Sequence, residues 1–76
     1  MSDEVDRVAW VSAALDSGRA IRIIQDAGLT YLDVAEFCEV SKPTAWCWLN
    51  GRVNRPRRAH ALRLAALLTH IEEMSR

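Results

Sequence analysis

The strongest constraint on the fold is a pair of short helix-forming segments in the middle of the chain. Thr30 is followed three residues later by Asp33, a spacing typical of a capping box at a helix N-terminus. After a connection of only three residues, 39–41, a second helix begins, and Asn50-Gly51 is a helix-stop signal. Two helices joined by so short a connection predict a helix-turn-helix.

The rest of the chain also has helical patterns, because no alternation of apolar and polar residues continues beyond about four positions. The sequence therefore predicts an all-α fold of five helices, with residues 1–16 as an N-terminal helical extension and residues 17–76 as the helix-turn-helix domain. The first helix is expected to begin at Ser2 or Asp3 and to break at Ser17-Gly18. The other helices are expected at Arg19–Ala27, Tyr31–Cys38, Ser41–Asn50 and Arg57–Met74.

Helical periodicity predicts which side of each helix faces the core. In the first helix one side carries Val5, Val8, Ser12 and Leu15, and Trp10 points away from it. The inner side of the third helix is expected to carry Tyr31, Val34, Ala35 and Cys38. The inner side of the last helix is expected to carry Ala61, Leu64, Leu68 and Ile71.

The two tryptophans of the fourth helix are expected to face in different directions. With Ala45 inward and about 100° between successive residues, Trp48 and Leu49 fall on the inner side. Trp46 falls on the outer side together with Pro43, Cys47 and Asn50, and Lys42 and Thr44 lie on the flanks. We therefore expect Trp48 in the core and Trp46 at the surface.

Composition is that of a small globular protein. Half of the 76 residues are hydrophobic, which excludes a disordered chain, and no apolar run approaches the roughly 20 residues that cross a bilayer. The acidic opening MSDEVDR lacks the basic start of a signal peptide, so we expect a cytoplasmic protein with Cys38 and Cys47 as free thiols.

The spacing of these two cysteines from His60 and His70 does not fit a zinc finger. With no nucleophile–base set or phosphate loop either, we expect no metal ion, cofactor, small-molecule ligand or enzymatic activity.

Charge is divided unevenly along a chain whose net charge is zero. Residues 1–39 carry eight acidic side chains and three arginines, whereas residues 40–76 carry seven basic side chains and two acidic ones. No acidic residue lies between Val40 and Ile71. Such a basic segment favours a nucleic acid as the partner, although a solvated arginine-rich loop has the same composition.

Several short motifs in the middle of the chain occur together in one known family. They are Leu29-Thr30, Val34-Ala35-Glu36, Val40-Ser41, Ala45 with Trp48, Asn50-Gly51 and Pro56. With the flanking segments SGRAIRIIQDAG and RPRRAHALRLAALL, they make residues 17–70 similar to the Cro/C1-type (XRE) helix-turn-helix family. The resemblance is to short phage Cro-like or immunity-repressor-like proteins and to actinobacterial regulators. It implies a transcription regulator that binds a double-stranded DNA operator.

The resemblance also implies which residues contact DNA. Residues 41–50 would be the recognition helix in the major groove, with Lys42 donating to guanine. Apolar contacts would come from Pro43, Trp46 and Cys47, and phosphate contacts from Asn50, the basic loop and the backbone N–H groups near Thr30 and Tyr31. The implied set is Thr30, Tyr31, Ser41, Lys42, Pro43, Thr44, Trp46, Cys47, Asn50, Arg52, Asn54, Arg55, Arg57 and Arg58.

The chain departs from the family at three places. Glu39 stands where the turn usually has glycine, and a left-handed conformation there would cost about 1 kcal/mol. Leu49 replaces a glutamate that usually pairs with an arginine of the first helix. Trp46 and Cys47 occupy outward positions that usually hold small polar residues, so the base preference cannot be carried over from the family.

Other roles for the same residues stay open. Trp46 can cover Phe37 or anchor a protein interface instead of contacting DNA, and Cys47 can be a redox-sensitive thiol instead of an inert one. The alternative for the whole domain is a protein-interaction module, such as an antitoxin or an adaptor, that uses Trp10 and the acidic N-terminal segment.

We expect a weak homodimer that is formed or tightened on DNA, because one recognition helix contacts too few base pairs to select a site. Trp10, Leu62 and Leu67 are apolar residues that the core does not obviously need, so one of the two terminal helices is expected at the interface. The alternative is a monomer that relies on tandem sites.

Overall fold

Five α-helices make up this computed structural model, which describes residues 3–51 and 56–74. They are α1 (Asp3–Ser17), α2 (Arg19–Asp26), α3 (Tyr31–Cys38), α4 (Lys42–Leu49) and α5 (Arg58–Met74). No strand occurs within these ranges, so the all-α prediction is confirmed, and the helix ends lie close to their predicted positions. None of the helices in the described part of the chain is both long enough and apolar enough to span a membrane.

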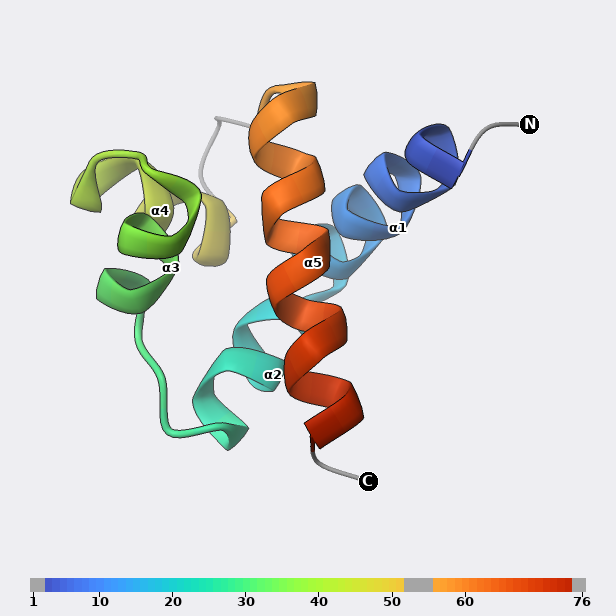
Figure 1. Cartoon of the computed structure of the whole chain (residues 1–76). Coiled ribbons are helices and arrows are strands. Elements are labelled where there is room, and N and C mark those ends of the chain that lie inside the picture. Colours follow the sequence, from blue (N-terminus) through green and yellow to red (C-terminus); the bar gives the residue numbers. More distant parts are fainter. Residues whose placement is uncertain (1–2, 52–55, 75–76) are drawn as a thin grey trace.

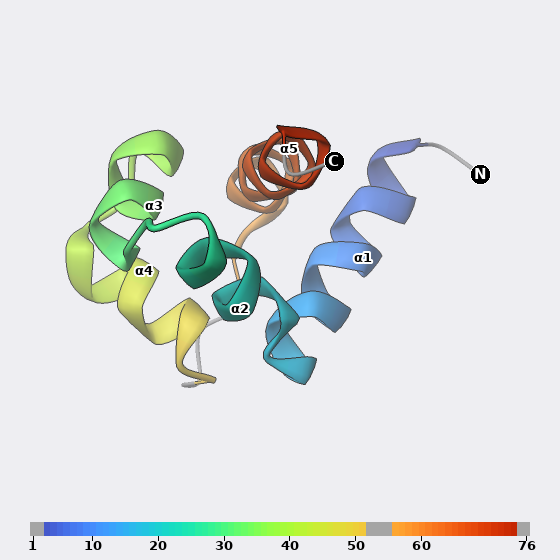
Figure 2. The ribbon, with the colours of Figure 1, turned by 90° about the horizontal axis from the view of Figure 1, so that it is seen from below.

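Helix α5 is the central element of the fold (Figure 1). It packs against α1, α2 and α3, while α4 packs against α3. Both ribbon views place α1 on one side of α5 and the α3–α4 pair on the other side (Figures 1 and 2). The α3–α4 pair thus lies on one flank of α5, with α1 on the opposite flank.

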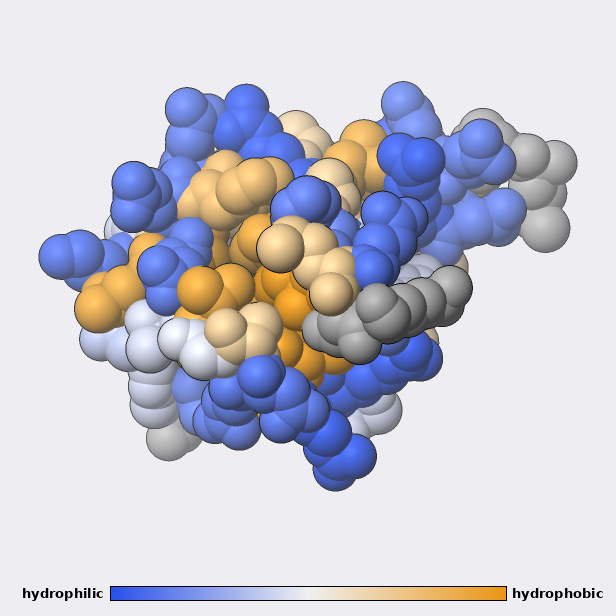
Figure 3. All heavy atoms as spheres, turned by 60° about the horizontal axis from the view of Figure 1, so that its bottom comes forward, coloured by the Kyte–Doolittle hydropathy of each residue, from blue (hydrophilic) through white to orange (hydrophobic). Residues whose placement is uncertain are grey.

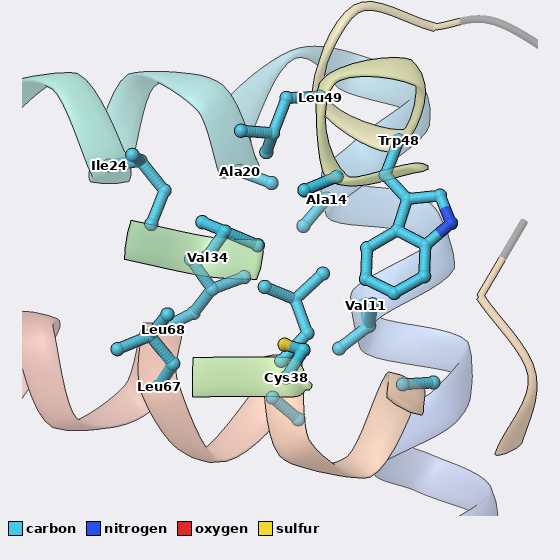
Figure 4. Packing of buried hydrophobic residues seen from close by; sticks show 14 of the residues in the cluster. Val11, Ala14, Ala20, Ile24, Val34, Cys38, Trp48, Leu49, Leu67 and Leu68 are labelled. Atoms are coloured by element: carbon cyan, nitrogen blue, oxygen red, sulfur yellow. The ribbon is translucent and has the colours of Figure 1, made fainter. Parts of the chain in front are cut away.

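The core is a single cluster to which all five helices contribute. Leu64 and Leu68 of α5 are fully buried, as are Ile24 of α2 and Val34 of α3. Figure 4 shows the indole ring of Trp48 pointing from α4 toward the other side chains of this cluster. In the space-filling view, hydrophobic residues gather in the middle of the face and hydrophilic residues surround them (Figure 3).

The inner face of α1 differs from the prediction. Val11 and Ala14 are the buried residues of this helix, whereas Val5 is 52% exposed. Val8 and Leu15 pack against the core only in part. The apolar residues of α1 occupy more than one side, so its own periodicity does not select one, and packing against both α5 and α2 decides its rotation.

Trp10 was also expected to point away from the core, and the structure corrects this. Its side chain is half-buried and packs against the core cluster. The guanidinium carbon of Arg19 lies 5.8 Å from the centre of its ring, within the range of a cation–π contact. Arg19 also forms an ion pair with Glu72 of α5 at 2.9 Å, so one arginine links α1, α2 and α5.

The break between α2 and α3 has a local cause. Gly28 has a φ of 76°, in the left-handed region that glycine adopts without a steric penalty. Its N–H donates to the carbonyl of Gln25 at 2.9 Å, and the N–H of Leu29 donates to that of Ile24 at 3.0 Å. This pair of bonds is a Schellman motif, which satisfies the last carbonyls of α2 and turns the chain toward α3.

We expect Trp48→Ala to lower the free energy of unfolding by about 3–5 kcal/mol, because it removes a large buried ring from the core. Trp48 is 3% exposed and Trp46, on the same helix, is 40% exposed. Trp46→Ala is therefore the matched control, with an expected loss of about 1 kcal/mol or less. Urea unfolding of both variants measures the difference, and equal losses would contradict the observed rotation of α4.

Candidate nucleic-acid interface

Helices α3 and α4, joined by a short turn at residues 39–41, form the segment for which the sequence predicts a helix-turn-helix. Ala45, Trp48 and Leu49 bury the inner side of α4, which confirms the predicted inner face. On the other side Lys42, Pro43, Trp46 and Asn50 are exposed. Thr44 and Cys47 are half-buried, so Cys47 is less accessible than its predicted outward position implies.

Glu39 forms the sharp turn between the two helices in the left-handed conformation, with φ 58° and ψ 46°. The N–H of Glu39 donates to the carbonyl of Glu36 at 3.3 Å, and the N–H of Val40 donates to that of Ala35 at 3.0 Å. These bonds close α3 with a second Schellman motif, here without a glycine.

The Glu39 carboxylate forms an ion pair with Arg63 of α5. This contact ties the turn to the central helix, so both a backbone motif and a side-chain pair hold the geometry of the turn. The sequence does not predict this role of Arg63, because no local pattern connects two residues that are 24 positions apart.

The hydroxyl groups at the start of α4 have structural partners. The Ser41 Oγ accepts a hydrogen bond from the Thr44 N–H at 3.3 Å, which makes Ser41 the N-cap of α4. The Ser41 and Thr44 hydroxyl oxygens lie 2.7 Å apart and share a second hydrogen bond. Both side chains therefore stabilise the helix start, and Lys42 is the exposed charged group beside them.

At the other end of α4, one amide hydrogen of Asn50 is already used. Its Nδ2 donates to the carbonyl of Trp46 at 2.9 Å, which caps the helix C-terminus. An amide carries two hydrogens, so the second remains for an external acceptor such as a phosphate. The bond also fixes the position of the Asn50 side chain next to Trp46.

The start of α3 confirms the capping box. The Thr30 N–H donates to Asp33 Oδ2 at 2.9 Å, and the Leu32 N–H donates to Thr30 Oγ1 at 3.2 Å. The Thr30 N–H was expected to hold a phosphate, but it already donates its hydrogen to the Asp33 carboxylate. The Asp33 carboxylate also places a negative charge at this helix end.

Four of the predicted site residues line one surface depression, with a volume of about 290 Å³. Thr30 and Tyr31 come from the start of α3, and Trp46 and Asn50 come from the outer side and end of α4. Its remaining lining residues are Ile21, Ile24, Gln25, Leu29 and Leu49. The fold thus brings together residues that are separated by up to twenty positions in the sequence.

The basic loop was predicted to contact phosphates through Arg52, Asn54, Arg55, Arg57 and Arg58. Of these, Arg52, Asn54 and Arg55 lie outside the described residues. Arg57 and Arg58 are exposed at the start of α5. Arg58 forms an ion pair with Glu4 of α1, on the flank of α5 opposite to α4 (Figures 1 and 2).

His60, two residues further along α5, connects that helix to α4. Its ring centre lies 5.9 Å from that of Trp48, at an interplanar angle of 41°. This tilted arrangement is typical of a favourable contact between aromatic rings. Nothing in the local sequence around His60 predicts this contact, because its partner Trp48 is twelve positions earlier and on another helix.

The two cysteines have different environments. Cys38 is fully buried, as predicted, and burial raises the pKa of its thiol to about 11, although the charge of Arg63 opposes this shift. Cys47 is a second free cysteine and is half-buried. No group of three potential metal ligands occurs among residues 3–51 and 56–74.

Comparisons with protein-family models, with curated proteins and with solved structures found no match.

Glu39→Gly and Glu39→Ala both remove the ion pair with Arg63, but only glycine adopts the left-handed turn without strain. We expect the glycine variant to be more stable than the alanine variant by about 1 kcal/mol. Thermal unfolding of the two proteins measures this difference. Equal stability would mean that residue 39 leaves the left-handed region in the folded protein.

Proposed function

We propose that this chain is a sequence-specific regulator of transcription that binds double-stranded DNA, with α4 in the major groove. The observation that carries the proposal is the outer face of α4, where Lys42, Trp46 and Asn50 are exposed on a helix that follows a tight turn. This face belongs to the segment Val40–Ile71, which contains no acidic residue. A DNA backbone would meet no like charge from this segment.

An α-helix such as α4 fits the groove. With its side chains a helix is about 10–12 Å across, and the major groove is about 12 Å wide. In this arrangement Lys42 near the N-terminus donates to a guanine, while Trp46 contacts a thymine methyl or a sugar. Asn50 and Tyr31 line the same depression. In the proposed complex the Asn50 amide and the Tyr31 N–H hold phosphates on either side of the groove.

The second candidate is a protein-interaction module, which is favoured by exposed apolar residues on α3. Phe37 is 48% exposed, and Leu32 on the same helix is also exposed. Neither residue has a role in the proposed DNA contact. Trp10 is a weaker anchor for a partner than expected, because it is half-buried and Arg19 lies over its ring.

DNA binding should weaken steeply with salt, with a slope of log K against log salt of about −0.9 for each phosphate neutralised. Arg57→Ala should lower the affinity for all sequences alike and flatten the slope by about one unit. Arg7→Ala is the matched control. It removes one positive charge from α1, which lies on the side of α5 away from α4, and it should leave the slope unchanged. Fluorescence anisotropy with a duplex chosen from random sequences measures both, and salt-independent binding would contradict the proposal.

A weak homodimer on DNA remains part of the proposal, with one correction to its expected surface. Leu67, expected to be available for the interface, is buried in the core, whereas Leu62 is half-buried. We expect footprinting to reveal a palindromic site with half-sites about one helical turn, or 34 Å, apart. Protection of a single unrepeated half-site at saturation would instead indicate a monomer.

A further inference from the structure

We propose that Glu4 competes with a DNA phosphate for the Arg58 guanidinium, so that the acidic first turn of α1 restrains DNA binding. This inference rests on the proposed function and adds an internal regulator to it. Arg58 is the first residue of α5, and Glu4 lies in the first turn of α1, 54 residues earlier. Their ion pair is the contact from which the inference starts.

The position of α1 explains why this pair opposes DNA binding. In both ribbon views α5 lies between α1 and the α3–α4 pair (Figures 1 and 2). The start of α5 is itself close to α4, because the rings of His60 and Trp48 are in contact. An Arg58 side chain bound to Glu4 is therefore directed toward α1, on the side of α5 opposite to the proposed interface.

Helix electrostatics favour Glu4 in this place. The N-terminus of a helix carries a partial positive charge, so Glu4 is stabilised at the start of α1, together with Asp3 and Asp6. Arg58 is at the start of α5, where the same effect disfavours a cation. Pairing with Glu4 relieves that unfavourable interaction, and a phosphate at the same position would relieve it as well.

The pair is exposed enough to exchange partners. The Arg58 side chain is 65% exposed and that of Glu4 is 56% exposed, and ion pairs of this kind are weak in water. A phosphate brought close by α4 can therefore displace Glu4 without unfolding of α1. Because the competitor is weak, its removal should raise DNA affinity by about two- to fivefold rather than by orders of magnitude.

The test is a double-mutant cycle of Glu4→Gln and Arg58→Ala in the full chain, with affinity for the selected duplex as the measurement. Glu73→Gln is the matched control, because it makes the same change of charge 15 residues beyond Arg58, about 22 Å along α5. We expect Glu4→Gln to raise affinity about two- to fivefold and Glu73→Gln to raise it less. In the Arg58→Ala background, Glu4→Gln should have no larger effect than Glu73→Gln.

Circular dichroism of each variant checks that the helices remain folded. Equal effects of Glu4→Gln and Glu73→Gln in the native background would indicate general charge repulsion and overturn the inference. A gain from Glu4→Gln that survives in the Arg58→Ala background would overturn it as well. Both outcomes leave the proposed function intact, whereas a wild-type protein without salt-dependent DNA binding would overturn the function and the inference together.

Discussion

Burial of Trp48 fixes the rotation of α4 about its own axis, and the residues that α4 presents on its outer face depend on that rotation. The indole ring enters the core and contacts the His60 ring at the start of α5. Since successive helical residues are about 100° apart, this leaves Trp46 on the outer side of α4. A single large side chain therefore determines what α4 can offer to a partner.

Basic residues of the acid-free segment have two kinds of surroundings. Arg63 is paired with Glu39 at the turn, and Arg58 is paired with Glu4 of α1. Both pairs attach α5 to another part of the fold, so part of the positive charge serves the structure. Lys42 and Arg57 are also exposed but belong to neither of these two ion pairs, and the proposed DNA contact depends mainly on them.

The helix ends and most of the inner faces could be predicted, because they depend on residues within one turn of each other. Thr30 with Asp33, Ser41, and Gly28 all act on backbone groups next to them, and the structure has each of these motifs. Trp48 was predictable for a related reason: the helical repeat from Ala45 placed it inward. The helical repeat predicted the wrong inner face for α1, because the apolar residues of that helix lie on more than one side.

The sequence by itself thus determined five helices, their ends and the tight turn between the third and fourth, since short-range hydrogen bonds and periodicity are local. Only the tertiary structure decided that Val11 and Ala14 face the core, that Glu39 meets Arg63, and that Glu4 meets Arg58. It also gathered Thr30, Tyr31, Trp46 and Asn50 around one depression. These contacts join residues far apart in the chain, and they form because α5 packs in the centre and fixes the directions in which the other helices face.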